Sequence, residues 1–311
     1  MIGDKSDPRK TFGKAVFEEA RSNSNIVALS ADSGGSSGLG DFKKEFPDRY
    51  YEFGIMEQGV LGIASGLAAT GRIPVFCAIA PFVTARPFEM FRNDIGYMKQ
   101  NVKIVGRNSG ISYSDLGSTH HSLEDFAIIR MIPGVTVLAP QDPGEITSAV
   151  KAMLAMDGPV YMRIGNNPIP ELFEAKPFTI GKASVLQEGS DVAIISTGAL
   201  TGAVLQAAEL LRSQGIKPRI IGMPTVNPID RAAVVDCAKI CGCIVTVEEH
   251  YVAGGLGTLV QEVVGEEFPV KVKKLGIPHT YATSGPYDEL LAYYGLDAAG
   301  IAKSVEGFVK G

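Results

Sequence analysis

The chain has little cysteine, no strong excess of either charge and no long apolar run. Four cysteines in 311 residues do not make a disulfide framework, so we expect a reducing compartment, the cytoplasm. A net charge of −5 lacks the basic excess of a nucleic-acid-binding protein. No stretch approaches the roughly 20 apolar residues of a membrane helix, and the first residues lack the apolar core of a signal peptide. We therefore expect no nucleic-acid partner and no membrane.

Common phosphate-binding and metal-binding motifs are also missing. Neither GxGxxG nor GxxxxGK[ST] follows a predicted strand, which excludes the usual nucleotide-binding fingerprints. The glycine cluster at 254–257 opens a predicted helix, where an anion can bind, but a tight strand-to-helix turn is the commoner explanation. Cys237, Cys241 and Cys243 do not have the paired spacing of a zinc site. We expect these thiols in the core and no metal site within the chain.

The apolar pattern predicts two α/β domains in series. The first half contains predicted strands that alternate with helices, at 25–31, 73–79, 102–106, 135–139 and 159–164, with one long helix over 84–100. A linker follows around 166–188, and the alternation then restarts. Such alternation indicates mostly parallel sheets with helices on both faces. We assign residues 1–170 to the first domain and 186–311 to a smaller second domain.

One stretch, residues 51–68, combines a short aromatic strand, a turn at Gly54 and a helix that begins with Glu57. The sequence around Glu57 is mostly apolar, and an apolar environment disfavours the charged form of a carboxyl group. Such a group can hold or share a proton near neutral pH, as a catalytic acid does. The helix is rich in small residues, which indicates that a backbone or a bound ring packs closely against it. A solvent-facing acid at a helix N-terminus is the alternative explanation.

Further candidates lie where predicted strands end. His120 and His121 close a loop rich in Gly and Ser, where a histidine can give or take a proton. A surface histidine pair is the alternative. Phe82 follows the strand at 73–79, at the edge where parallel sheets bind ligands. Core packing is the alternative for this ring.

Taken together, four segments resemble the C-terminal half of a transketolase. They are residues 51–68 with Glu57, 80–93, 117–120 and 247–257. More narrowly, the chain resembles the C-terminal subunit of transketolases that are split into two chains. The resemblance covers nearly the whole chain. It implies a pyrimidine-binding domain followed by a smaller transketolase C-terminal domain.

The resemblance also implies thiamin diphosphate as the cofactor and gives roles to particular residues. Glu57 has the position of the acid that hydrogen-bonds the pyrimidine of the cofactor, and Phe82 matches the aromatic residue that stacks on it. Ile79 stands where a second aromatic wall is common. His120 matches the histidine that hydrogen-bonds the sugar. Arg163 matches the arginine that binds the sugar phosphate, for which its forked donor geometry is suited.

Two positions depart from the transketolase pattern. Leu116 replaces an aspartate whose role in the family is to read a substrate hydroxyl, and Asn108 stands where a phosphate-binding histidine is common. A leucine side chain cannot hydrogen-bond. A modified sugar or an oxo-acid donor therefore becomes an alternative to the usual ketose phosphates.

The Gly-Asp-Gly motif with which the family holds Mg²⁺ and the diphosphate is missing from this chain. The resemblance then implies that a separate N-terminal transketolase subunit supplies it, in an assembly with two copies of each chain. The predicted function is transfer of a two-carbon ketol unit between sugar phosphates. The alternatives are the β-subunit of a 2-oxo acid dehydrogenase, a deoxyxylulose-phosphate-synthase-like enzyme, and a scaffold that keeps only the fold.

Overall fold

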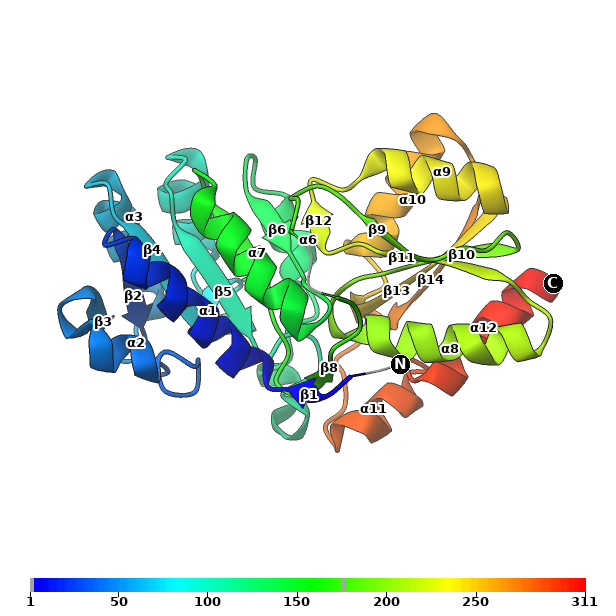
Figure 1. Cartoon of the computed structure of the whole chain (residues 1–311), viewed down its shortest axis with the longest axis horizontal. Coiled ribbons are helices and arrows are strands. Elements are labelled where there is room, and N and C mark those ends of the chain that lie inside the picture. The colour runs from blue at the N-terminus through cyan, green and yellow to red at the C-terminus, as the bar shows by residue number, and fades with distance from the viewer. Residues whose placement is uncertain (1–2, 175–176) are drawn as a thin grey trace.

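The first of two α/β domains is built on a seven-stranded sheet of order β12-β6-β7-β5-β4-β2-β3 (Figure 1). The computed structural model describes residues 3–174 and 177–311. Every strand pair of this sheet is parallel except β12–β6. The elements of this half are β1 (Lys5–Ser6), α1 (Pro8–Ser22), β2 (Ile26–Ser30), α2 (Gly40–Glu45), β3 (Tyr50–Glu52), α3 (Glu57–Ala69), β4 (Ile73–Ile79), α4 (Ala80–Val83), α5 (Phe88–Met90), β5 (Lys103–Arg107), α6 (Asp125–Arg130), β6 (Thr136–Leu138), α7 (Pro143–Ala155), β7 (Val160–Arg163) and β8 (Ile169–Pro170).

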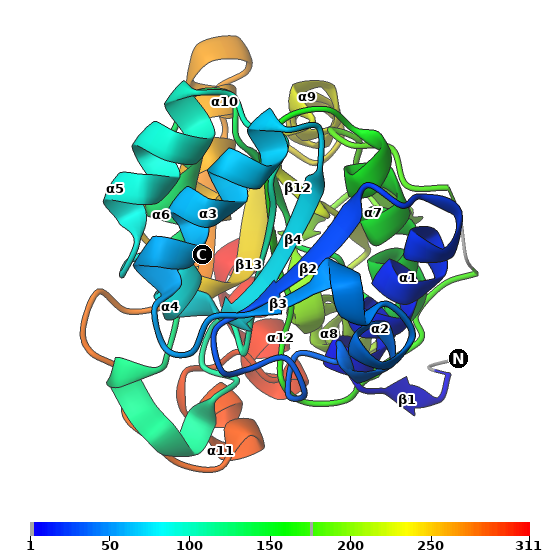
Figure 2. The same ribbon diagram turned by 90° about the vertical axis from the view of Figure 1, so that its left-hand side faces the viewer.

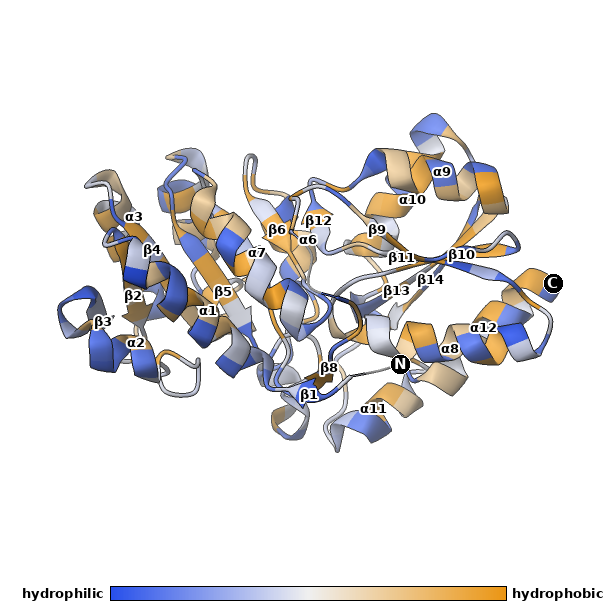
Figure 3. Ribbon diagram, viewed as in Figure 1, coloured by the Kyte–Doolittle hydropathy of each residue, from blue (hydrophilic) through white to orange (hydrophobic). Residues whose placement is uncertain are grey.

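Helices cover both faces of this sheet, as Figure 2 shows from the left-hand side of Figure 1. On one face α1 packs against α7, and Phe12, Val16 and Val150 lie in the apolar core there. On the other face α3 and a π-helical segment, Phe91–Tyr97, enclose a second core that includes Leu61. The apolar colouring of the central strands in Figure 3 reflects this burial on both faces, which parallel sheets require.

The second domain has a five-stranded sheet of order β14-β13-β10-β11-β9, in which only β9 runs antiparallel to its neighbour. In Figure 1, α9 and α10 lie on one side of this sheet and α8 and α12 on the other. The elements are β9 (Ser184–Gln187), β10 (Val192–Ser196), α8 (Thr201–Ser213), β11 (Pro218–Gly222), β12 (Thr225–Asn227), α9 (Arg231–Cys241), β13 (Cys243–Tyr251), α10 (Leu256–Glu267), β14 (Lys271–Ile277), α11 (Tyr287–Tyr293) and α12 (Ala298–Lys310). The predicted fold class is thus confirmed.

The structure corrects the predicted organisation in two places. The long helix expected over 84–100 begins only at Phe88, after a turn at 84–87, and consists of α5 followed directly by the π-helical segment Phe91–Tyr97. Pro87, which lies between α4 and α5, has no amide hydrogen to donate to a preceding carbonyl, so a regular helix does not continue through it. In addition, β12 comes from the second half of the chain but pairs with β6 in the first sheet. The two domains therefore share a strand as well as a linker.

No helix of the described ranges, 3–174 and 177–311, is long and apolar enough to cross a membrane. In the same ranges, no group of three or more His, Cys, Asp or Glu side chains is arranged to hold a metal ion. Cys237 is buried as expected, whereas Cys241 and Cys243 are only partly buried. The glycine cluster at 254–257 forms a turn into α10, and the Glu248 carboxylate already accepts hydrogen bonds from the first amides of that helix, those of Leu256 and Gly257.

Candidate functional site

Glu57 begins α3 at the carboxyl edge of the first sheet. Gly54, with a φ of +70°, makes the turn between β3 and this helix, a conformation that glycine adopts without strain. The Glu52 carboxylate accepts a hydrogen bond from the Gly54 amide at 3.1 Å, which fixes the turn. The side chain of Glu57 is only 4% exposed. The alternative of a solvent-facing acid is therefore wrong, and the carboxyl group is buried.

The surroundings of Glu57 are not apolar, which corrects a sequence-based expectation. Nη1 of Arg86 donates to Oε2 of Glu57 at 2.7 Å. The same guanidinium lies over the ring of Phe82, with its central carbon 3.9 Å from the ring centre. A planar cation thus joins the buried carboxylate to an aromatic face. The Arg86 side chain is 38% exposed, so it has room to move away from both.

Phe82 and His120 meet next to this ion pair. Phe82 lies on α4, directly after β4, whose last residue is the half-buried Ile79. The Phe82 ring packs edge-on against the His120 imidazole, with 5.2 Å between ring centres. The Tyr113 ring also packs edge-on against His120, with 5.5 Å between ring centres. The structure thus brings together three predicted residues, Glu57, Phe82 and His120, through Arg86. We call these four the catalytic cluster, after the roles that the resemblance implies for the three predicted residues.

The loop that carries His120 starts at Asn108, which directly follows β5. Asn108 is buried and has a φ of +57°, and its side-chain carbonyl accepts a hydrogen bond from Nη1 of Arg107 at 2.8 Å. Arg107 also donates to the hydroxyls of Ser36 and Ser37. Leu116 lies on a 3-10 turn, Ser114–Thr119, and is 47% exposed. Leu116 is therefore open to a ligand, whereas the Asn108 amide oxygen is already engaged by Arg107.

Arg163 makes its hydrogen bonds within the protein. Its Nη1 donates to Asp125 Oδ1 at 2.9 Å, and its Nη2 donates to the Glu249 carbonyl at 2.9 Å. Its guanidinium also lies 4.3 Å from the centre of the Phe126 ring, and the side chain is only 6% exposed. With both ends of the fork bonded within the protein, Arg163 joins the two domains. Binding of a sugar phosphate, which the resemblance implies for Arg163, would have to displace one of these bonds.

Sequence reasoning missed Arg86, Arg107 and Tyr113. Arg86 lies within the segment 80–93 that carries the resemblance, four residues after Phe82, so its place in the motif was a usable signal. Arg107 is the last residue of β5, immediately before Asn108. Nothing in the local pattern marks Tyr113, whose role depends on how the loop folds back onto His120.

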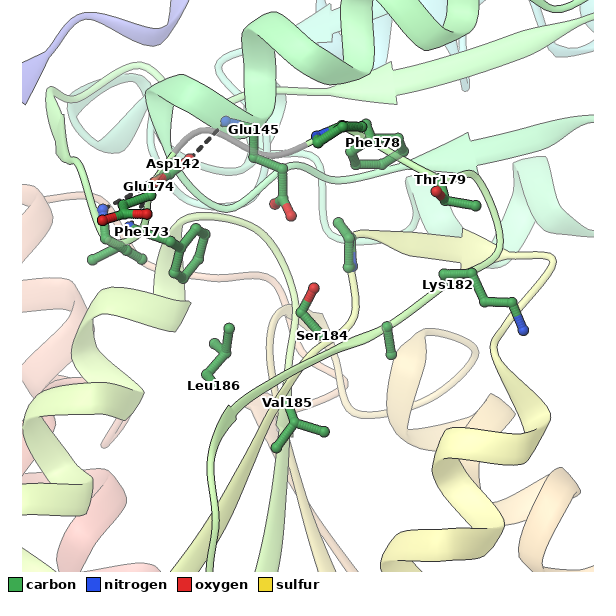
Figure 4. Close-up of a pocket in the computed structure, with 14 residues that line it drawn as sticks. Asp142, Glu145, Phe173, Glu174, Phe178, Thr179, Lys182, Ser184, Val185 and Leu186 are labelled. Carbon is green, nitrogen blue, oxygen red and sulfur yellow. Dashed lines mark hydrogen bonds between the residues drawn. The ribbon is translucent and has the colours of Figure 1, made fainter.

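A separate pocket lies between α7, the linker and β9 (Figure 4). Glu145 and Lys182 line it, together with Phe173 and Phe178. Asp142 begins α7 and accepts a hydrogen bond from the Glu145 amide at 2.7 Å, and its second oxygen accepts from the Leu172 amide of the linker at 2.9 Å. The pocket contains none of the catalytic cluster. Burial raises the pKa of the Glu145 carboxyl to about 8.

The fold and the site together define a class: two α/β domains in series, with a buried acid, an aromatic face and a histidine at the carboxyl edge of the first sheet. The chain matches the family model for the transketolase pyrimidine binding domain over residues 4–169. It also matches the model for the transketolase C-terminal domain over residues 181–301. The chain belongs to the transketolase family, as the four segments indicated.

The relatives match nearly the whole chain. It is 40% identical to an apulose-4-phosphate transketolase subunit of Phocaeicola vulgatus over 304 residues, 97% of each chain. It is 38% identical to the 6-deoxy-6-sulfo-D-fructose transketolase subunit SqwH of a Clostridium species, over 95% of this chain and 92% of that one. A solved chain is described as "Split gene transketolase, inactive beta4 tetramer", where beta4 denotes the subunits of that assembly. It superposes with a TM-score of 0.92 at 38% identity, over 98% of both chains.

Asp125→Ala should destabilise the fold strongly, because it leaves the buried Arg163 guanidinium without its counter-charge and removes the partner of the Tyr161 hydroxyl. Breaking a buried ion pair by removing one partner costs about 3–5 kcal/mol. The matched control is Glu262→Ala, which breaks a half-exposed pair with Arg130 and should cost less than about 1 kcal/mol. Urea unfolding of both variants measures the difference; equal losses would contradict the role given to Arg163.

Glu145→Gln should change how stability depends on pH. An unfolded glutamate has a pKa of about 4.3. Because burial raises the folded pKa to about 8, the protonated carboxyl stabilises the fold at low pH, and this contribution is lost as pH rises through 8. Glutamine stays neutral, so the variant should gain stability relative to the wild type between about pH 5 and pH 9. Denaturant unfolding at both pH values tests this, with the half-exposed Glu262→Gln as control; a constant difference would refute it.

Proposed function

We propose that this chain is the C-terminal subunit of a two-chain transketolase that transfers a two-carbon ketol unit between sugar phosphates with thiamin diphosphate. The observation that carries the proposal is the catalytic cluster, in which a buried carboxylate, an aromatic face and a histidine converge at one sheet edge. A scaffold that kept only the fold would have no need of these three groups together. The relatives named as transketolase subunits support the same reaction class.

The cluster fits the pyrimidine ring of the cofactor. The Arg86 guanidinium is planar, donates a hydrogen bond to Glu57 and lies over Phe82, with 3.9 Å from its carbon to the ring centre. A planar ring with hydrogen-bonding nitrogens would make the same two contacts once Arg86 moves aside. Stacking of this kind is worth roughly 1 kcal/mol beyond the burial of area. Ile79, at the end of β4, would form the aliphatic second wall.

Thiamin diphosphate supplies an electron sink at the C2 carbon of its thiazolium ring. The work of this chain is to hold the pyrimidine and to control protons around it. Glu57 would hold a proton that it shares with a nitrogen of the pyrimidine ring. Phe82 would fix the plane of the ring. His120, half-buried at the end of its loop, would hydrogen-bond a substrate oxygen.

The residues of the loop that carries His120 bear on which sugar is used. Leu116 is 47% exposed and cannot hydrogen-bond a hydroxyl, whereas a polar residue at this position would. The relatives are named for apulose 4-phosphate and for 6-deoxy-6-sulfofructose, which are modified sugars. We therefore place the donor among modified ketoses, with Asn108 and Leu116 as the residues that distinguish it from common ketose phosphates.

The partner would be an N-terminal transketolase subunit that holds Mg²⁺ and the diphosphate. An exposed apolar surface beside the catalytic cluster supports a contact there: Ile55 is 75% exposed and Met56 45% exposed, directly before Glu57. Gly62 and Gly66 on α3 are also accessible, with room over Gly66 for close approach of another backbone. We propose two copies of each chain, with the copies of this chain in contact, acting in the cytoplasm on carbohydrate metabolism.

A decarboxylating enzyme is the second candidate. The chain is 37% identical to a 1-deoxy-D-xylulose-5-phosphate synthase of Geobacter sulfurreducens over 304 residues, but it spans only 47% of that protein. Release of CO₂ from an oxo-acid donor by the assembled enzyme, without ketol transfer between sugars, would favour this candidate. Ketol transfer without CO₂ release would favour the transketolase.

Glu57→Gln should abolish turnover while the chain still folds and assembles. Glutamine is nearly isosteric, and its carbonyl can still accept the hydrogen bond from Arg86, but the amide cannot share a proton with the pyrimidine. A general acid–base contribution of about 10²–10⁴-fold should be lost. The measurement is hydrogen–deuterium exchange at C2 of the cofactor in the assembled complex, with Glu89→Gln, an exposed acid on α5, as control. Wild-type exchange in a well-folded variant would remove Glu57 from the mechanism.

The chain alone should bind thiamin diphosphate weakly and be inactive, because it lacks the Gly-Asp-Gly motif for Mg²⁺ and the diphosphate. The similar solved chain is described as an inactive tetramer of β-chains, which agrees with this expectation. Calorimetry with thiamin diphosphate and Mg²⁺, with and without the N-terminal subunit, tests the two-chain proposal. Tight Mg²⁺-dependent binding by this chain alone would contradict it.

A further inference from the structure

Glu249 lies on β13, the second strand of the C-terminal sheet, yet its side chain reaches the loop that carries His120. Its Oε1 accepts a hydrogen bond from the backbone amide of Ile111 at 2.7 Å, and its Oε2 accepts one from the Tyr287 hydroxyl at 2.8 Å. Glu249 is 7% exposed and Ile111 is fully buried. We call residues 108–121 the substrate loop. The Glu249 carboxylate therefore links this loop directly to the C-terminal domain.

The substrate loop is closed at its base next to this contact. Gly110 and Ser122 exchange two backbone hydrogen bonds, at 3.1 and 2.9 Å. Ile111 follows Gly110 directly, and His120 comes two residues before Ser122. Ile111, whose amide is bonded to Glu249, is thus attached to the closed base of the loop. His120, which would face the substrate, is attached to the same base. A displacement at Ile111 would therefore act on the same base that carries His120.

The carboxylate fits against the loop backbone with no spare room. Gly110 has a φ of +63°, and a Cβ built on it would collide with the carboxyl group of Glu249. The Glu249 backbone is itself fixed, because its carbonyl accepts the hydrogen bond from Arg163 Nη2 at 2.9 Å. A second hydrogen bond joins the loop to the C-terminal half of the chain near the other end of the loop, where the Ser118 hydroxyl donates to the Ala282 carbonyl at 2.6 Å.

We infer that Glu249 is a positioning residue: from the C-terminal domain it sets the conformation of the substrate loop and thereby the place of His120. The inference rests on the proposed function, in which His120 contacts the donor sugar. It gives the C-terminal domain a part in substrate binding, whereas all four residues of the catalytic cluster come from the first domain.

The neighbouring residue Glu248 provides a matched control. It lies on the same strand and is also buried, but its carboxylate accepts from the amides of Leu256 and Gly257 at the start of α10. Glu248→Gln and Glu249→Gln therefore make the same chemical change in similarly buried places. Each replaces one acceptor oxygen with an NH₂ group and turns the remaining charge-assisted hydrogen bond into a neutral one, which is roughly half as strong. Of the two, Glu249 is the one that contacts the substrate loop. Tyr287→Phe is a milder second variant, which removes one hydroxyl and leaves the bond to Ile111 in place.

The first measurement uses this chain alone and needs no cofactor. Backbone amide hydrogen exchange, followed by mass spectrometry of peptides, should be faster across the substrate loop in Glu249→Gln than in the wild type. Glu248→Gln should leave the loop unchanged and speed exchange at the start of α10 instead. Unchanged loop exchange in a folded Glu249→Gln chain, or equal acceleration in both variants, would overturn the inference.

The second measurement uses the assembled two-chain enzyme with fructose 6-phosphate, apulose 4-phosphate and 6-deoxy-6-sulfofructose as donors. Glu249→Gln should lower kcat/KM by about 10- to 100-fold through misplacement of His120, mainly through KM. Exchange at C2 of the cofactor, which depends on Glu57, should stay within about twofold of the wild type. The kcat/KM of Tyr287→Phe should fall between those of the wild type and Glu249→Gln. Glu248→Gln should keep the wild-type KM.

The outcomes separate this inference from the proposed function. A wild-type complex that turns over no donor and shows no C2 exchange would defeat the proposed function, while loop exchange would still report on the contact of Glu249. If the wild type is active and Glu249→Gln keeps its KM, the positioning role is wrong. A parallel loss of kcat/KM and C2 exchange in Glu249→Gln would also overturn it, because a general disturbance of the fold would then explain the effect.

Discussion

The buried Arg163 guanidinium is the contact on which the arrangement of this molecule depends. It leaves the end of β7 in the first domain, pairs with Asp125 and reaches the backbone of Glu249 in the second domain. A buried charge is tolerated only where it is paired and its donors are satisfied, and here the pairing with Asp125 and the bond across the domain boundary provide both. Arg163 thus holds the backbone of Glu249, the residue whose side chain bonds the substrate loop at Ile111.

The local pattern of apolar residues was enough to predict most of the strands and helices. The strand Ile73–Ile79 has the bounds that its apolar run indicated, and the strand Val160–Arg163 lies within the predicted 159–164. Both features depend on residues close together in the chain. The region after β4 could not be predicted in this way, because periodicity does not reveal that Pro87 and a π-helical segment replace a continuous helix.

The positions of site residues were predictable where a motif fixes the backbone. The ion pairs were not predictable where a long side chain can reach several partners. Glu57 and Phe82 lie where regular elements meet, and His120 lies in a segment that carries the resemblance, so their convergence could be expected. The pairing of Arg86 with Glu57 links positions 29 residues apart, and Arg163 with Asp125 links positions 38 apart. An arginine can reach several candidates within its length, and the sequence does not say which carboxylate the fold brings near. The bonds of Arg163 to Asp125 and to the Glu249 carbonyl, which the sequence did not predict, are of this kind.

The two carboxylates at the end of β13 show how a single strand can support two distant structures. Side chains of successive residues in a strand point to opposite faces, so Glu248 is directed to α10 and Glu249 to the substrate loop. Burial raises the pKa of each carboxyl to about 7, so neither is held there by a favourable charge state alone; each is retained by hydrogen bonds to backbone amides. In the proposed two-chain enzyme this gives a physical reason for keeping the pyrimidine-binding and C-terminal domains in one chain. The subunit that holds the diphosphate would meet this chain across a surface, whereas the substrate loop would have its shape set by a strand of the second domain of the same chain.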